Sequence, residues 1–245
     1  LSKTFKLDLI CEPKIDGLSI SLLYLDGSLV NAVTRGDGTV GEIVTENIKT
    51  IKDIPINLVK PFPKFIEIRG EIFMKKADFH KLNKSQLENG KKIFANTRNA
   101  SAGSVRQKDT RITKNRNLNF FAFSIGEYSK DFYFETQSDL LKKFNAMGFL
   151  VNNENKIVNN LSHINNFYEH ILSIRDKLDY EIDGLVYKVN DVKLQTRLGS
   201  ITRAPRWAIA HKLPAEIVET IILNIEIQVG RTGALTPVGK LKPVR

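Results

Sequence analysis

The stretch Cys11–Ile20, CEPKIDGLSI, contains a word that decides the fold, because the same word returns far along the chain. The four residues Ile15–Leu18, IDGL, recur as Ile182–Leu185. A lysine, Lys14, precedes the first copy, whereas another lysine, Lys188, follows the second copy. Outside this echo the chain shows no internal repeat, so the two copies call for an explanation other than a duplicated module.

Extended segments dominate the sequence around and beyond the first copy. The runs Leu18–Tyr24 and Ser28–Thr34 flank Asp26-Gly27, and an aspartate-glycine step between two β-rich runs predicts a hairpin. In Phe65–Phe73 isoleucines alternate with charged residues, which predicts a strand with one buried face. Further strands are predicted at Leu118–Ile125, Tyr180–Asn190, Trp207–Leu213 and Ile225–Val229, and helices after Thr136, with Gly148 as the C-cap, and from Ser162. The predicted class is α+β, with antiparallel sheets flanked by helices.

Length and composition set the domain organisation. The chain has 245 residues, of which 42% are apolar and 26% charged, as in ordinary globular proteins. No apolar run approaches the length of a membrane span. The chain starts at Leu1 without a leader pattern, so we interpret it as a piece of something longer. The region of Pro214 is the best boundary, which predicts one domain over residues 1–216 and the beginning of another over 217–245.

The charge balance favours a polyanionic partner. The net charge is +10 and the isoelectric point is near 9.6. A solvated basic surface is one reading, and neutralisation of nucleic-acid phosphates by lysine and arginine is the other. The single cysteine, Cys11, excludes a disulfide framework and a cysteine-based zinc site, and its apolar neighbours predict a small core residue.

A glycine-rich segment at Gly36–Gly41 fits the pattern G-x-G-x-x-G but lacks its usual context. A dinucleotide fingerprint needs a parallel β-α-β unit, whereas the strand before Gly36 belongs to the predicted hairpin. Pro55 also makes the next extended run a poor central strand. We therefore reject a Rossmann fold, and a turn that approaches a phosphate or ribose stays open.

The first copy of the repeated word places a lysine between two carboxylates. In an extended segment Glu12, Lys14 and Asp16 share a face. A surface ion pair is the plain interpretation. Apolar residues on both sides favour another, because a poorly solvated lysine has a lowered pKa and its neutral amine is a nucleophile. Sequence spacing alone does not show whether other charged residues converge on this lysine.

These residues resemble a known enzyme family. The pattern Glu12-x-Lys14-x-Asp16-Gly17 is similar to the lysine motif shared by DNA ligases, RNA ligases and capping enzymes. Longer words narrow the resemblance to the bacterial NAD-dependent DNA ligases, in order and over almost the whole chain. They are TRGDG (34–38), IRGE (68–71), FANTRNASAGSVRQ (94–107), EIDGLVYKVN (181–190), APRWAIAHK (204–212) and VGRTGALTP (229–237).

The resemblance implies an adenylation domain, followed by the start of an OB-fold, and a role for each matched position. Lys14 would be the catalytic nucleophile that takes AMP from NAD, with Mg²⁺ assisting, and passes it to the 5′-phosphate of nicked double-stranded DNA. The implied nucleotide-binding residues are Glu12, Asp16, Arg35, Glu71, Asp183, Lys188 and Lys212. The implied DNA-binding residues are Arg98 and Arg106. On this view the two IDGL words are two separate motifs that line one nucleotide pocket.

The resemblance also implies what a complete enzyme would add. The family seals nicks in replication and repair, and a bacterial member would work in the cytoplasm at the nucleoid. A nicotinamide-binding segment, the rest of the OB-fold, a zinc finger, helix-hairpin-helix repeats and a BRCT domain are not matched, so full nick sealing by this chain is not expected. We expect residues 217–245 to be loosely held. The alternatives are an ATP-dependent nucleotidyltransferase and a non-catalytic nucleotide- or DNA-binding remnant of a truncated ligase.

Three positions depart from the family pattern. Thr97 stands where proline is usual, and His211 and Leu213 stand where aromatic residues are usual. The charged positions are kept, so we expect these changes to be tolerated.

Overall fold

The computed structural model describes residues 7–36, 40–201, 204–214 and 218–244. The chain divides into two compact units, Leu1–Leu213 and Pro214–Arg245. The boundary predicted between residues 216 and 217 lies outside the described residues and stays a prediction. None of the described helices is both long enough and apolar enough to cross a membrane.

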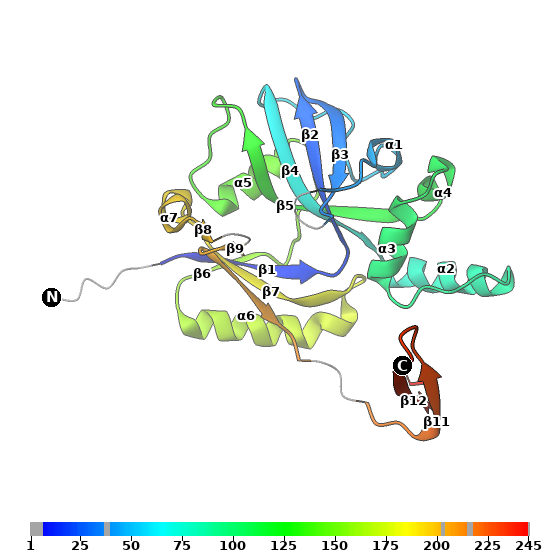
Figure 1. The fold of residues 1–245 in the computed structure, drawn as a ribbon. Helices are drawn as coiled ribbons and strands as arrows, with labels where there is room; N and C mark the ends of the chain where they lie inside the picture. Colours follow the sequence, from blue (N-terminus) through cyan, green and yellow to red (C-terminus); the bar gives the residue numbers. More distant parts are fainter. Residues whose placement is uncertain (1–6, 37–39, 202–203, 215–217, 245) are drawn as a thin grey trace. The chain divides into compact units, whose positions relative to one another are not determined.

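A four-stranded antiparallel sheet of the larger unit, in the order β3-β2-β4-β5, carries much of its core (Figure 1). Its strands are β2 (Leu18–Leu25), β3 (Ser28–Thr34), β4 (Phe65–Met74) and β5 (Leu118–Tyr128). The predicted hairpin is confirmed, because Asp26 and Gly27 both have positive φ (47° and 79°), as a two-residue turn of this kind requires. The predicted α+β class with antiparallel sheets is also confirmed.

One face of this sheet is buried. Ile66, Ile68 and Ile72 on β4 are fully buried, as their alternation predicted. Short helix α1 (Thr45–Ile48) and helix α5 (Gln137–Ala146) contribute to the same core. The Thr136 side chain accepts a hydrogen bond from the Asp139 amide, which confirms the predicted start of α5, and the C-cap is Met147, one residue before the predicted Gly148.

A second antiparallel sheet has the order β10-β7-β1-β6. Its strands are β1 (Leu9–Ile15), β6 (Lys156–Val158), β7 (Ile182–Val189) and β10 (Ala208–Lys212). Helix α6 (Leu161–Ile174) runs along one face of this sheet (Figure 1) and begins after the cap residue Asn160, slightly before the predicted Ser162. Cys11 is buried in this core, and burial raises the pKa of its thiol to about 12, which confirms a packing role.

Strand β1 separates two cores. Cys11 and Ile15 pack on the side of α6, whereas Ile10 packs into the core of the first sheet. Because side chains alternate along a strand, Glu12 and Lys14 lie on the same face as Ile10, turned toward the first sheet. The catalytic candidates therefore lie where the two four-stranded sheets of the larger unit face each other.

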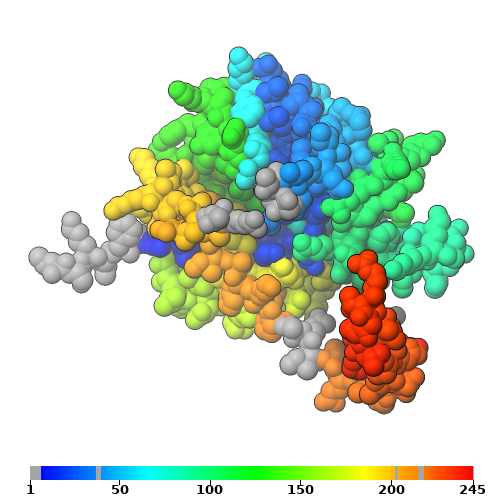
Figure 2. All heavy atoms as spheres, in the orientation of Figure 1, coloured from blue at the N-terminus to red at the C-terminus, as the bar shows by residue number. Residues whose placement is uncertain are grey.

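The segment between β4 and β5 forms helices that the sequence patterns did not predict. They are α2 (Lys76–Glu88), α3 (Thr97–Val105) and α4 (Thr110–Lys114). Helix α2 has no fully buried residue, and only partly buried side chains such as Phe79 and Leu82 pack against the core, so its apolar pattern is weak. Figure 2 shows this part of the chain projecting from one side of the larger unit. Three more short elements follow β7: α7 (Val192–Leu198), β8 (Ser200–Ile201) and β9 (Ala204–Pro205), and a 3-10 turn (Arg175–Lys177) follows α6.

The smaller unit is an antiparallel hairpin of β11 (Ile222–Val229) and β12 (Leu235–Leu241). The strand predicted at Ile225–Val229 is confirmed. Large apolar side chains such as Ile225 and Val229 are exposed within the unit. Its assignment as the start of an OB-fold and its expected weak protection from hydrogen exchange stay predictions.

Candidate active site

The two IDGL words lie side by side in the second sheet. Strands β1 and β7 pair so that Ile15 is opposite Ile182 and Lys14 is opposite Gly184. The Asp16 amide donates a hydrogen bond of 2.9 Å to the Glu181 carbonyl, which extends the pairing past the end of β1. The register shifts between Lys14 and Ile15, and this leaves Asp183 without an opposite residue. The repeated word therefore marks two partner strands.

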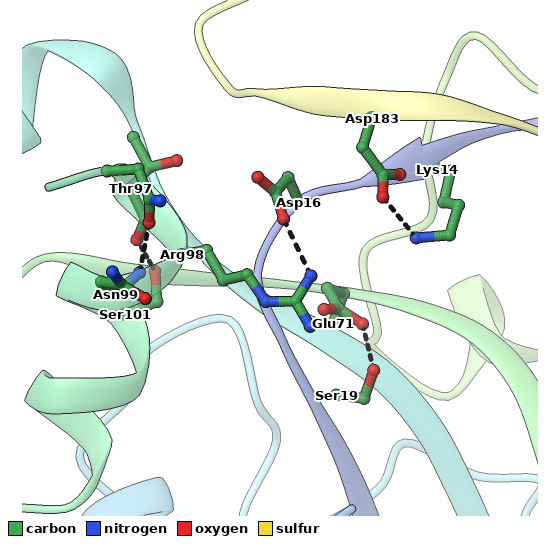
Figure 3. Close-up of polar contacts among 10 residues, drawn as sticks. Lys14, Asp16, Ser19, Glu71, Thr97, Arg98, Asn99, Ser101 and Asp183 are labelled. Carbon is green, nitrogen blue, oxygen red and sulfur yellow. Dashed lines mark hydrogen bonds and ion pairs between the residues drawn. The ribbon is translucent and has the colours of Figure 1, made fainter. Parts of the chain in front are cut away.

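The shifted register brings the first predicted pair of site residues together. The Lys14 Nζ donates to Asp183 Oδ2 at 2.8 Å (Figure 3). The two side chains are 36% and 32% exposed, so the amine is paired and open to solvent, and the dry apolar setting expected for Lys14 is not observed. Asp183 Oδ1 is buried and has no hydrogen-bond partner among the described residues.

The glycine of each IDGL word allows another strand to come close. A Cβ on Gly17 would fall on the carbonyl oxygen of Ile72 in β4. A Cβ on Gly184 would collide with the backbone of His211 and Lys212 in β10. Glycine at these positions lets backbones approach where any side chain would separate them. Both words therefore combine a carboxylate with a point of close strand packing.

Cross-strand register places a second lysine near Lys14. Gly184 is paired with Lys14 on one side and with Lys212 of β10 on the other. Residues in one row of a sheet project from the same face, so Lys212 belongs to the face that carries Lys14. Lys212 is exposed and forms no ion pair within the described ranges. Its charge is available to an anion bound over this face.

Glu12 and Lys188 form a second lysine–carboxylate pair, deeper in the molecule. Lys188 Nζ lies 2.7 Å from Glu12 Oε2 and donates to the Phe123 carbonyl at 2.8 Å. Both side chains are less than one-tenth exposed. Gln137 Nε2 donates to the same Phe123 carbonyl at 3.0 Å. The pair therefore connects β1, β7 and β5, and direct phosphate contact by Lys188 stays a prediction.

Glu71 reaches the site from the first sheet. Ser19 of β2 lies opposite Glu71 of β4, and its hydroxyl donates to Glu71 Oε2 at 2.6 Å (Figure 3). Glu71 is 8% exposed. Burial raises the pKa of its carboxyl to about 7, although Ser19, Lys14 and Arg98 act in the opposite direction. Glu71 therefore changes protonation near neutral pH.

The two arginines predicted to face DNA belong to helix α3 and its C-terminal end. Arg98 reaches from α3 toward the site, where its Nη1 lies 3.2 Å from Asp16 Oδ1 (Figure 3). Arg106, the C-cap of α3, is ion-paired with Glu42. Both side chains are about half exposed, and exposed pairs of this kind exchange readily for other anions.

A cavity of about 870 Å³ opens over the face of the first sheet that is turned away from its core. Ser19 and Arg35 line its inner end, which is the end nearer to Lys14 along β2, and Glu67 and Arg69 line its outer end. Phe123 also lines the cavity, whereas Lys14, Asp183 and Glu71 are not among the lining residues. Arg35 forms no ion pair within the described part of the chain. Volumes of this size are typical of small-molecule sites. Ser19 therefore lines the cavity and also contacts Glu71.

Sequence reasoning missed Ser19 and Phe123. Phe123 lies in a strand of consecutive aromatic and apolar residues, where nothing distinguishes a wall of a cavity from core. Ser19 lies in an ordinary alternating strand. A signal for Ser19 exists only in the pairing of β2 with β4, because that register sets it opposite Glu71.

The described residues contain no cluster of three or more histidine, cysteine, aspartate or glutamate side chains that could hold a metal ion. Mg²⁺ commonly takes only one or two carboxylates and completes its shell with water and phosphate oxygens. The assistance of Mg²⁺ that the resemblance implies therefore stays a prediction.

The three departures from the family pattern have local explanations. Thr97 is the first residue of α3, a position where proline is well suited, and its buried hydroxyl has no partner among the described residues. His211 stacks on Tyr168 at 4.8 Å between ring centroids, so its ring still packs as an aromatic one. Leu213 is buried in the core beneath α6.

Comparison with known proteins fits this geometry. The family model described as NAD-dependent DNA ligase adenylation domain matches residues 1–216. The chain is 54% identical over 244 residues to a protein named DNA ligase from Bartonella henselae, covering 100% of this chain and 34% of that protein. It is 54% identical to a DNA ligase from Neisseria meningitidis serogroup C (98% and 29% covered) and 49% identical to one from Hahella chejuensis (98% and 35%).

The chain thus spans about a third of the length of the curated relatives it matches. A solved structure named "Pmar-Lig_Pre." shares 13% identity with a TM-score of 0.49, over 97% of this chain and 52% of that one, and so distant a likeness supports no argument. The match over residues 1–216 and the identity to the curated relatives show the family: the chain belongs to the adenylation domains of the NAD-dependent DNA ligases.

Proposed function

We propose that the chain carries out the first step of DNA ligation, the transfer of AMP from NAD to Lys14. The observation that carries this proposal is the Lys14–Asp183 contact of 2.8 Å, about one-third exposed to solvent, on a face that also presents Lys212. An accessible amine with a carboxylate beside it is suited to nucleophilic attack. Membership in the ligase family, with Lys14 as the nucleophile, accounts for both the geometry and the sequence match.

The step balances with groups present in the site. The Lys14 Nζ forms a bond to the adenylyl phosphorus of NAD, and the pyrophosphate P–O bond on the other side breaks to release nicotinamide mononucleotide. The attacking amine must lose its proton. Asp183 Oδ2 lies within hydrogen-bond distance of Nζ and is positioned to accept it. The product is a lysyl-AMP phosphoramidate.

The surrounding residues would hold the nucleotide at the inner end of the cavity. Arg35 and Lys212, which form no ion pair with any residue that the structure describes, would neutralise phosphate oxygens, which stabilises charge that develops at phosphorus. The ring of Phe123 lines the cavity and offers a stacking surface to the base. Glu71 would accept a hydrogen bond from a hydroxyl or amine of the nucleotide. The buried ion pair of Glu12 and Lys188 would hold strands β1 and β7 in place beneath the nucleotide.

The later steps of ligation need DNA and belong to the longer protein. Arg98 and Arg106 would exchange Asp16 and Glu42 for phosphates of nicked DNA, as the net charge of +10 favours. AMP would pass to the 5′-phosphate at the nick, and the 3′-hydroxyl would displace it. In a complete enzyme this reaction would serve replication and repair in the bacterial cytoplasm, at the nucleoid.

Intact-mass measurement tests the proposal directly. The purified chain is incubated with NAD and Mg²⁺, and in parallel with ATP and Mg²⁺, beside the variant Lys14→Arg. Lys49→Arg is a matched control, because Lys49 is also 36% exposed and also ion-paired, with Glu46 at 2.7 Å. We expect one added adenylyl group from NAD in the wild type and in Lys49→Arg, and none in Lys14→Arg.

Other outcomes identify other functions. An adduct only from ATP would place the chain with ATP-dependent nucleotidyltransferases. No adduct from either nucleotide, together with retained binding of nicked DNA, would support a non-catalytic remnant. If an adduct from NAD forms only when the nicotinamide-binding segment of a relative is added as a separate chain, the pocket is competent and the missing segment presents the substrate.

A further inference from the structure

Ser19 forms a polar contact that connects the cavity wall with Glu71. Its hydroxyl donates to Glu71 Oε2 at 2.6 Å, and the two residues are directly opposite in the pairing of β2 with β4. Ser19 also lines the inner end of the cavity beside Arg35. A group that bonds one oxygen of a carboxylate fixes the direction of the other oxygen. Ser19 therefore controls where Glu71 Oε1 points.

The space around Glu71 makes this contact important. A Cβ on Gly17 would lie 3.0 Å from Glu71 Cγ, so the absence of a side chain at Gly17 leaves room for the side chain of Glu71. The charged groups that act on Glu71 are Lys14 of β1, Asp16 of the turn after it and Arg98 of α3. Arg98 already forms an ion pair with Asp16, and Lys14 forms one with Asp183. Within the described residues, the hydroxyl of Ser19 is the hydrogen-bond donor to Glu71.

We propose that Ser19 is a positioning residue for nucleotide binding, because its hydroxyl holds the Glu71 carboxylate with Oε1 turned to accept a hydrogen bond from the nucleotide. This inference rests on the function proposed above and adds a residue that no motif of the family contributed. The Ser19 hydroxyl also stabilises the charged form of Glu71, so its loss would move the carboxyl further toward the neutral acid.

Strand β2 itself supplies a matched control. Ser21 lies one pleat farther along the same face, and its hydroxyl donates to Glu67 Oε1 at 2.5 Å, at the outer end of the cavity. Ser19→Ala and Ser21→Ala each delete a hydroxyl that bonds a glutamate of β4. They differ in which glutamate loses its donor. Ser19→Thr restores a hydroxyl at the inner position in a residue that strands accommodate well.

Two measurements test the proposal. The first is the binding of AMP by calorimetry between pH 6 and pH 8.5 (chosen to bracket neutral pH). We expect Ser19→Ala to weaken AMP binding about tenfold at pH 7, the size expected for loss of an oriented, charge-assisted hydrogen bond. We expect Ser21→Ala to bind as the wild type does and Ser19→Thr to recover most of the affinity. The affinity lost in Ser19→Ala should be smaller at the upper end of the pH range, where Glu71 is ionised in both proteins.

The second measurement is the titration of the Glu71 carboxyl by carbon NMR in the chain without nucleotide. Ser19→Ala should raise the midpoint, and Ser21→Ala should leave it in place. Unchanged AMP affinity and an unchanged midpoint in Ser19→Ala would overturn the inference, as would equal effects of both alanine variants. A wild-type chain that neither binds AMP nor forms an adduct would overturn the proposed function and this inference with it, whereas normal wild-type binding with an unaffected Ser19→Ala would overturn this inference alone.

Discussion

Strands β1 and β7 exchange two lysine–carboxylate pairs, and the two pairs differ in depth. Glu12 of β1 binds Lys188 of β7, and Lys14 of β1 binds Asp183 of β7, at 2.7 Å and 2.8 Å. The first pair is less than one-tenth exposed and its lysine also binds a backbone carbonyl, whereas the second pair is about one-third exposed. The same kind of ion pair on neighbouring rows of one sheet thus gives a buried pair that joins the strands and an accessible amine beside it.

The largest expected effect follows from breaking the buried pair. In Lys188→Met the Glu12 carboxylate would stay in the core without its cation, and loss of one partner of a buried pair destabilises by about 3–5 kcal/mol. Urea unfolding of the variant measures this change. The double variant Glu12→Gln/Lys188→Met removes both charges and should recover much of the stability. If Lys188→Met unfolds at the same urea concentration as the wild type, the pair does not support the fold.

The second largest effect on stability is expected at Glu71, whose carboxyl changes protonation near neutral pH. Its folded pKa of about 7 lies above the unfolded value of 4.5, so the stabilising neutral form is fully present below pH 4.5. That stability is lost as the pH rises through 7. Glu71→Gln stays neutral throughout, and its gain over the wild type should grow to roughly 3 kcal/mol above pH 7.

Thermal or urea unfolding of Glu71→Gln and the wild type at pH 5 and pH 8 measures this difference. We expect nearly equal stabilities at pH 5 and a clear advantage of the variant at pH 8. The variant should bind AMP more weakly, because a neutral amide oxygen accepts a weaker hydrogen bond than a charged carboxylate does. A constant difference at both pH values would show that ionisation of Glu71 does not govern stability here.

The sequence predicted the elements on which the comparison depends, and local chemistry explains why. Alternation put Glu12 and Lys14 on one face of a strand, and Asp26-Gly27 specified the hairpin by its need for positive φ. The resemblance assigned Lys14 and Asp183 to one pocket, and the pairing of β1 with β7 brings them into contact. Short-range patterns and long motif words were sufficient for these features.

The rest depended on tertiary pairing that no local pattern encodes. The register shift beside Lys14 decides that Asp183 meets this lysine, and a shift of one residue is invisible in either strand alone. The difference in depth between the two pairs arises from β5 and its Phe123 carbonyl, more than a hundred residues from β1. The helices between β4 and β5 were missed because α2 has no fully buried residue and α3 buries mostly small or polar side chains, such as Ser101 and Ser104.

The smallest effect on stability is expected at the exposed pair of Lys14 and Asp183, and it distinguishes the roles of the two pairs most clearly. Asp183→Asn removes the charge of the exposed pair, and because water reaches both side chains we expect the free energy of unfolding to change by no more than about 1 kcal/mol. The amine of Lys14 would lose the carboxylate that orients it and accepts its proton, so the rate of adduct formation with NAD should fall by about a hundredfold or more. Urea unfolding and time-resolved intact mass on the same protein sample separate the two effects. A variant that unfolds at lower urea concentration and reacts at the wild-type rate would reverse the assignment, because the exposed pair would then be the structural one. A variant that is stable but slow would show that the buried pair supports the fold and the exposed pair serves the reaction.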